Sequence, residues 1–143
     1  MTEFDRVYLD TAPIIYYLDR DINFGAVTKS IFHELLLADC KLITSTITCE
    51  EYLVHVYRSR NFNAETLFFR FLDDFDIDVL DVTREIAGKA AHIRAEYAAL
   101  KAMDALQLSA ASVSHCGLFL TNDKQLRQFR EFKCVTLSGF FQL

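Results

Sequence analysis

Short apolar runs alternate with longer stretches of helical periodicity along almost the whole chain. The runs lie at residues 6–10, 41–46, 77–81, 117–121 and 133–137, and the helical stretches lie at 12–19, 24–39, 49–60, 62–75, 84–100, 103–115 and 123–130. Strands that alternate with helices need crossover connections, which make the strands parallel and place helices on both faces of the sheet. Uninterrupted apolar runs suit strands that are buried on both sides. We therefore expect an α/β fold around a parallel sheet of about five strands.

The length and composition indicate one globular unit. A chain of 143 residues can bury a full core, so we expect residues 1–143 to form a single domain. Of these residues 52% are apolar, including 13 Phe and 6 Tyr, which excludes disorder. No apolar run approaches the ~20 residues that span a bilayer, and the N-terminus shows no signal-peptide pattern. The sequence predicts a soluble, cytoplasmic protein with no membrane partner.

The cysteines and histidines show neither a disulfide framework nor a metal-binding pattern. The four cysteines form no CxxC pair and stand among apolar neighbours (Cys40, Cys49, Cys116 and Cys134). Buried free thiols explain them better than disulfides or a zinc site. The four histidines lack HExxH or related spacing, so we expect structural or surface roles for them.

The net charge of −5 argues against tight nonspecific binding of nucleic acid by bulk electrostatics. It leaves room for a local basic strip. The candidates for such a strip are Arg58, Arg60, Lys124, Arg127, Arg130 and Lys133.

Four acidic residues occupy positions where the alternating pattern of strands and helices predicts apolar residues. Asp10 ends the first predicted strand, Asp123 follows the fourth, and Glu51 and Asp104 fall in the first turns of predicted helices. A carboxylate at the end of a buried element is costly unless something pairs with it, and no obvious basic partners lie nearby in the sequence. In an open parallel sheet, ligands bind beyond the carboxyl ends of the strands. Oxygen ligands at one such edge predict a site for a divalent cation.

Each of these carboxylates also has a purely structural interpretation. Asp10 could cap a helix, although Thr11, with Pro13 in the first turn, is the expected cap of helix 12–19. Thr48 and Glu51 read as a capping box at the start of helix 49–60. Asp104 suits a helix N-terminus through the macrodipole, and Asp123 suits a turn. The metal site is favoured because four independent caps need not meet at one edge of a sheet.

Other patterns point to packing and not to chemistry. The acidic stretch 73–78 lacks the Gly and terminal Glu of an EF-hand loop, so we expect a solvated helix end. There is no Gly-rich phosphate loop. Apolar residues at helical spacing in 62–75 predict core packing, not a base-stacking platform (Phe62, Leu67, Phe68, Phe71, Leu72 and Phe75).

Four segments, taken in order, resemble the motifs of PIN-domain nucleases, a family that includes the VapC-type toxins of toxin–antitoxin modules. Residues 7–11 resemble the first motif, and residues 45–53 resemble the second, with Glu51 at the position of its Glu. Residues 103–111 are similar to the Asp-Ala-Leu motif, and residues 118–123 to the strand that ends in Thr-Asn-Asp. The Gly often seen before the third motif is absent. The resemblance covers essentially the whole chain and implies a three-layer α/β/α sandwich.

The resemblance further implies Mg²⁺- or Mn²⁺-dependent hydrolysis of RNA, with a small antitoxin protein as partner. Asp10, Asp104 and Asp123 would hold the metal, and Glu51 would complete the site and orient or deprotonate the attacking water. The remaining candidates are Thr11, Thr121 and Asn122 for ligand orientation or phosphate contact, and Arg58, Lys124 and Arg127 for RNA contact. A non-catalytic binding module and a DNA-directed structure-specific nuclease are the alternative functions. A second copy of the chain, forming a homodimer, is a further candidate partner.

Overall fold

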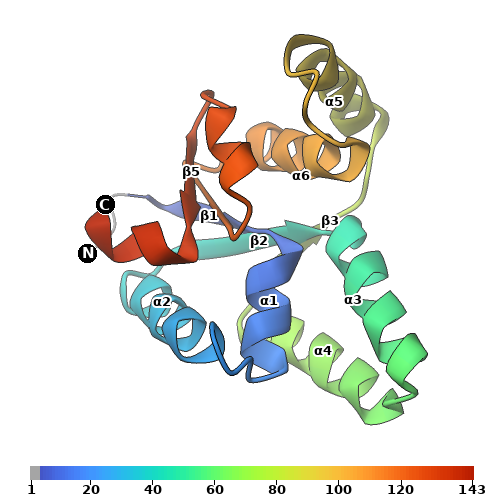
Figure 1. The fold of residues 1–143 in the computed structure, drawn as a ribbon, viewed down its shortest axis with the longest axis vertical. Coiled ribbons are helices and arrows are strands. Elements are labelled where there is room, and N and C mark those ends of the chain that lie inside the picture. The colour runs from blue at the N-terminus through green and yellow to red at the C-terminus, as the bar shows by residue number, and fades with distance from the viewer. Residues whose placement is uncertain (1–3) are drawn as a thin grey trace.

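Five parallel strands form the centre of the molecule. The computed structural model describes residues 4–143, and the strand order is β3-β2-β1-β4-β5 (Figure 1). All four neighbouring pairs are parallel. The strands are β1 Arg6–Leu9, β2 Lys41–Ser45, β3 Asp78–Leu80, β4 Leu118–Thr121 and β5 Lys133–Thr136. The chain adds β2 and β3 on one side of β1 and then crosses to add β4 and β5 on the other, so the strand order reverses between β1 and β4.

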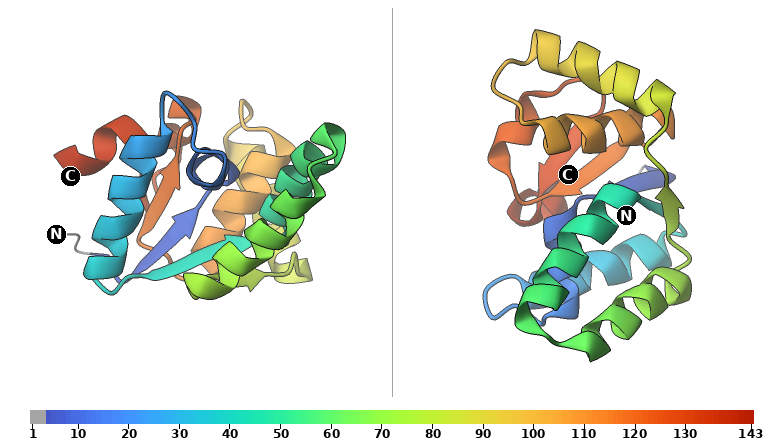
Figure 2. Two further views of the ribbon diagram at one scale, coloured as in Figure 1. Left: turned by 90° about the horizontal axis from the view of Figure 1, so that it is seen from below. Right: turned by 90° about the vertical axis from the view of Figure 1, so that its right-hand side faces the viewer.

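Helices cover both faces of this sheet, as the alternating pattern predicts. The helices are α1 Thr11–Leu18, α2 Gly25–Leu37, α3 Thr46–Ser59, α4 Phe62–Asp74, α5 Arg84–Glu96 and α6 Ala102–Val113, with 3₁₀ helices η1 Lys124–Gln128 and η2 Leu137–Gln142. In β1, Val7 and Leu9 face the core that α1 to α4 and η2 cover, while Tyr8 faces the core under α5, α6 and η1. Figure 2 shows the sheet between these two layers. The three-layer α/β/α sandwich is confirmed.

The predicted elements are all present, with shifted boundaries. Helix 123–130 is a shorter 3₁₀ helix, η1, and helix 84–100 ends at Glu96. The structure adds η2 after β5, where the sequence shows no long helical period.

The predicted caps Thr11 and Thr48 are wrong, whereas the interpretation of Asp10 as a helix cap is confirmed. Asp10, not Thr11, caps α1, because its side chain accepts the Thr11 N–H at 2.8 Å. Helix α3 starts directly after β2, with Ser45 as its cap. Thr48 and Glu51 therefore form no capping box, and Glu51 lies in the second turn of α3 instead of the first. The structural interpretation of Glu51 is lost with that box.

The Phe-rich helix packs as predicted only in part. Phe68, Phe71 and Leu72 are buried, whereas Phe62 and Leu67 are exposed. The cysteines are free thiols, and the carboxylates of Asp73 and Asp74 are solvated at the end of α4, both as expected. None of the helices among residues 4–143 has the length and apolar character needed to cross a membrane.

Candidate metal centre at the carboxyl edge of the sheet

The point where the strand order reverses brings the ends of β1 and β4 together. Leu9 of β1 pairs with Leu120 of β4, and the N–H of Asp10 donates to the Leu120 carbonyl at 3.0 Å. Asp10 therefore sits beside the segment from Thr121 to Asp123, although more than 110 residues separate them in sequence. Open parallel sheets bind ligands at this position.

A backbone N–H and a side-chain hydroxyl hold the Asp10 carboxylate. Its Oδ1 accepts the Thr11 N–H at 2.8 Å, and its Oδ2 accepts the hydroxyl of Thr121 at 2.7 Å. The same Thr121 oxygen accepts the N–H of Asp123 at 3.0 Å. One buried hydroxyl therefore links two of the candidate ligands. Burial raises the pKa of Asp10 to about 6, with a further contribution from the charges of Asp104 and Glu51, despite the hydrogen bonds that favour the ionised form.

Glu51 reaches this edge from α3. Its Oε1 accepts the hydroxyl of Thr11 at 2.7 Å, so the side chain points toward the start of α1. This contact joins residues 40 positions apart and replaces the local capping bond that the sequence predicts. The Thr11 hydroxyl thus fixes the orientation of Glu51, while its role in orienting a ligand stays a prediction.

Asp104 and Asp123 complete the acidic group. Asp104 is in the first turn of α6, whose N-terminal end lies on the same side of the molecule as that of α3 (Figure 1). Burial raises the pKa of Asp104, and so do the negative charges of Asp123 and Glu51, against a smaller opposing effect of Lys101. Asp123 is exposed and caps η1, accepting the Gln125 N–H at 2.9 Å. The predicted turn role of Asp123 is therefore correct, and it leaves Oδ2 free of that bond.

The four carboxylates interact but do not form a closed ligand cage. Asp10 is affected by Asp104 and Glu51, and Asp104 by Asp123 and Glu51, so all four lie within electrostatic range. Within residues 4–143 none of them makes an ion pair with a basic side chain. Across the same residues, no three carboxylate, imidazole or thiolate groups converge closely enough to hold one ion between them. Mg²⁺ keeps several waters and uses one or two carboxylates directly, and the donor set fits an ion held in that way.

Gln107, which no sequence motif singled out, organises the buried polar floor of the site. It is 1% exposed, and its amide makes four hydrogen bonds. The Nε2 group donates to Thr11 at 3.2 Å and to Thr48 at 3.1 Å. The Oε1 atom accepts the hydroxyls of Tyr8 and Ser45. One sequence feature could have indicated this role. Gln107 lies three residues after Asp104, among apolar and small residues of the same helix.

The other predicted residues divide by position. Asn122 donates to the Tyr16 hydroxyl at 3.1 Å and so ties the β4 turn to α1. Lys124 and Arg127 are exposed on η1, directly after Asp123. Arg58 is exposed in the last turn of α3, seven residues past Glu51 and about 10 Å farther along the helix axis. Lys124 and Arg127 therefore follow Asp123 closely along the chain, whereas Arg58 lies toward the other end of α3 from Glu51.

The family model described as PIN domain matches residues 7–131 of the chain. No curated protein sequence matches it at a significant level.

Several solved structures share the fold at low sequence identity. A chain of VapBC2 from Rickettsia felis bound to a DNA fragment from their promoter has a TM-score of 0.72 at 17% identity, over 92% of this chain and 98% of that one. A chain of a toxin–antitoxin complex from Klebsiella pneumoniae has a TM-score of 0.66 at 21% identity, over 92% and 97%. VapC20 from Mycobacterium tuberculosis, a sarcin–ricin loop cleaving toxin, has a TM-score of 0.66 at 14% identity, over 89% and 98%.

Proposed function

Because the chain belongs to the PIN-domain family, as the match over residues 7–131 shows, we propose that it is a metal-dependent endoribonuclease and the toxin of a VapBC-type toxin–antitoxin module. The single observation that supports the proposal is the electrostatic coupling of Asp10, Glu51, Asp104 and Asp123 near the reversal point of the sheet, without ion-pair partners among residues 4–143. Four mutually repelling carboxylates gain most from a bound cation.

Asp10, Asp104 and Asp123 would hold Mg²⁺ or Mn²⁺, directly or through its waters. The ion would lower the pKa of bound water and neutralise charge on the phosphate oxygens. Thr121 fixes the orientation of Asp10 by its 2.7 Å hydrogen bond. The raised pKa of Asp10 and Asp104 favours cation binding over an empty ionised site, because a cation relieves the same repulsion and burial that raise them.

Glu51 would orient the attacking water and accept its proton. Thr11 donates to Oε1 of Glu51, which leaves Oε2 for the water. Attack at phosphorus breaks the bond to the 3′ oxygen, which leaves with a proton from solvent. The products would carry 5′-phosphate and 3′-hydroxyl ends, as the family resemblance implies.

A small antitoxin is the proposed regulatory partner. Two of the similar structures, from R. felis and K. pneumoniae, are toxin–antitoxin assemblies, which supports this assignment. Growth arrest on expression of the chain, relieved by co-expression of a neighbouring small gene, is the expected result.

Cleavage of a defined RNA with Mg²⁺ or Mn²⁺ tests the activity. Asp10→Asn and Asp104→Asn should each lower cleavage by at least about 100-fold, the scale of losing one group that acts on the transition state. Asp73→Asn, which removes a solvated charge at the end of α4, is the matched control. Equal activity in all proteins would show a contaminating nuclease and end the assignment. A flap DNA run in parallel separates RNA from DNA cleavage.

A non-catalytic binding module is the second candidate, and the open spacing of the carboxylates favours it. Titration of Mn²⁺ into the wild type and Asp104→Asn distinguishes the two. Binding that weakens in the variant supports the enzyme, whereas no binding to the wild type supports the module.

A further inference from the structure

Four basic residues follow the acidic group at intervals of three. Lys124 and Arg127 lie in η1, Arg130 follows it, and Lys133 opens β5; all four are exposed. In a 3₁₀ helix, side chains at i and i+3 lie one above the other, about 6 Å apart along the axis. Lys124 and Arg127 therefore share one face of η1. This basic row, defined as residues 124, 127, 130 and 133, begins one position after Asp123.

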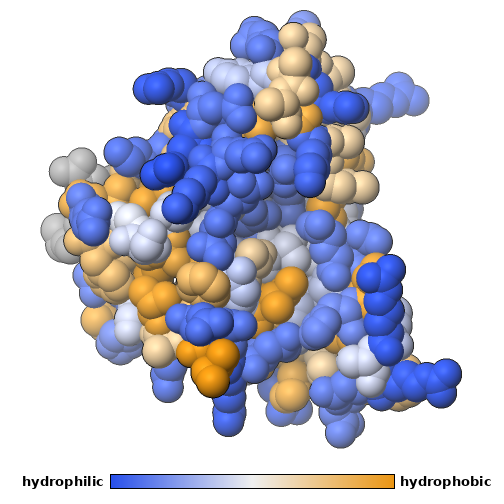
Figure 3. Space-filling view, in the orientation of Figure 1, coloured by the Kyte–Doolittle hydropathy of each residue, from blue (hydrophilic) through white to orange (hydrophobic). Residues whose placement is uncertain are grey.

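A groove continues the row along the edge of the sheet. Arg127, Arg130 and Lys133 line a hollow of about 570 Å³ against β5 and η2. That volume falls in the range of about 300–1,000 Å³ typical of ligand sites. The face of the molecule over η1 is predominantly hydrophilic (Figure 3). The lining of the groove combines these three cations with apolar side chains such as Phe132 and Val135.

The positive charges of the row are available to a ligand. Within residues 4–143 none of its four members makes an ion pair. The single acidic residue in 124–143 is Glu131, and Lys89 neutralises it through a 2.8 Å ion pair. Arg127 Nε also lies 3.4 Å from the Lys124 carbonyl, which holds that side chain against η1. In a chain of net charge −5, the row is a local exception that can attract an anion.

We propose that the basic row binds the phosphates of a single-stranded RNA segment that extends from the acidic group along η1 into the groove beside β5. This inference rests on the proposed RNA cleavage and names the path of its substrate. The carboxylates repel RNA wherever no cation covers them, so affinity must come from elsewhere on the surface. Regularly spaced cations suit RNA, because its phosphates are also regularly spaced. A peptide ligand need not have regularly spaced charges.

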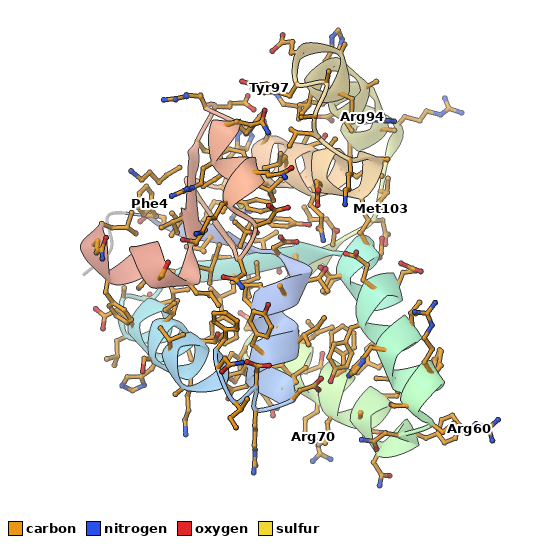
Figure 4. The ribbon with its side chains drawn as sticks, viewed as in Figure 1. Phe4, Arg60, Arg70, Arg94, Tyr97 and Met103 are labelled. Carbon is orange, nitrogen blue, oxygen red and sulfur yellow. The ribbon has the colours of Figure 1, made fainter. Side chains whose placement is uncertain are left out.

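The double variant Arg130→Gln/Lys133→Gln tests this path without touching the carboxylates. Its matched control is Arg70→Gln/Arg94→Gln, which removes the same two charges from side chains that project from α4 and α5 away from the row (Figure 4). Both variants are checked by thermal unfolding. The measurements are kcat and KM for RNA cleavage with Mg²⁺, and RNA affinity in EDTA as a function of salt.

If RNA follows this path, the Arg130→Gln/Lys133→Gln variant should have a higher KM and a nearly unchanged kcat. Losing two phosphate contacts should reduce the slope of log affinity against log salt by about 1.4 and weaken binding on the order of tenfold at 0.1 M salt. The control should stay within about twofold of the wild type in both quantities.

Three results would overturn the path. One is an unchanged KM and salt slope in the row variant. Another is an equal loss in the control, which would reduce the effect to net charge. A third is intact RNA binding together with weakened binding of a co-purified acidic partner, which would make the groove a protein-binding surface. Retained cleavage in Asp10→Asn would instead contradict the proposed function, while RNA affinity in EDTA still tests the row by itself.

Discussion

The Thr11 hydroxyl donates to Glu51 Oε1 at 2.7 Å, and this bond ties the first turn of α1 to the second turn of α3. Thr11 also accepts from Gln107, so one side chain connects the acidic group to the buried polar floor beneath it. The orientation of Glu51 thus depends on a residue from another element and not on its own helix.

Thr11→Val should uncouple Glu51 while keeping the side-chain shape. We expect a loss of about 1–2 kcal/mol in the free energy of unfolding, because Glu51 loses a donor and Gln107 loses an acceptor, and a clear fall in kcat for RNA cleavage. Urea denaturation and single-turnover cleavage measure these. Thr11→Ser should restore the rate. Thr28→Val removes a buried hydroxyl that donates to the Phe24 carbonyl at the cap of α2 and should leave kcat unchanged. Wild-type kcat in Thr11→Val would refute the positioning role.

Asp10 should make the metal-free protein less stable as the pH rises. Its folded pKa is about 6, above the ordinary 3.8, so between these values the folded state binds a proton that the unfolded state has released. The free energy of unfolding then falls as pH rises through this window, by up to about 3 kcal/mol. The raised pKa of Asp104 acts in the same direction.

Asp10→Asn should flatten that dependence. Thermal unfolding in EDTA at pH 5 and pH 7.5 is the measurement, and at pH 7.5 the variant should be the more stable protein. Saturating Mg²⁺ should stabilise the wild type more than the variant, since binding to the folded state raises stability in proportion to ln(1 + [L]/Kd). A variant less stable than the wild type at pH 7.5 in EDTA would contradict the assignment of strain to this carboxylate.

Gln107→Leu should destabilise the protein strongly. The substitution keeps much of the volume but deprives four buried hydroxyls of a partner, those of Tyr8, Thr11, Ser45 and Thr48. We expect a loss of about 2–4 kcal/mol in the free energy of unfolding, measured by urea denaturation. Gln125→Leu, on the exposed surface of η1, should change it by less than about 0.5 kcal/mol. An equal change in the free energy of unfolding for the two variants would show that the hydrogen bonds of Gln107 do not stabilise the fold.

Asp123 has a structural and a proposed chemical role, and two substitutions separate them. Asn can still accept the Gln125 N–H, so Asp123→Asn should keep wild-type stability while it lowers cleavage. Asp123→Ala should lose about 1 kcal/mol as well, because η1 loses its cap. Differential scanning calorimetry and the cleavage assay read the two effects independently. Full cleavage by Asp123→Asn would leave Asp123 as a cap alone.

Some expectations remain predictions. They include a single domain over residues 1–143, a cytoplasmic location and a homodimer.

The sequence alone determined the order of strands and helices and the likeness to PIN domains. Apolar runs and helical periods are properties of neighbouring residues, and they predicted every strand and all six α-helices. The places of Asp10 and Asp123 followed as well, because parallel strands end at a common edge.

Only the tertiary structure decided how the acidic edge is held. Helix α3 starts at Thr46, earlier than predicted, because Ser45 at the end of β2 caps it. Glu51 is therefore not part of the predicted capping box. The partners of Gln107 come from up to 99 positions away, so no local pattern could reveal them. Exposure along α4 depended on which neighbours cover it, which left Phe62 in solvent and Phe68 in the core. Contacts between distant segments arise from folding, and a linear pattern contains no record of them.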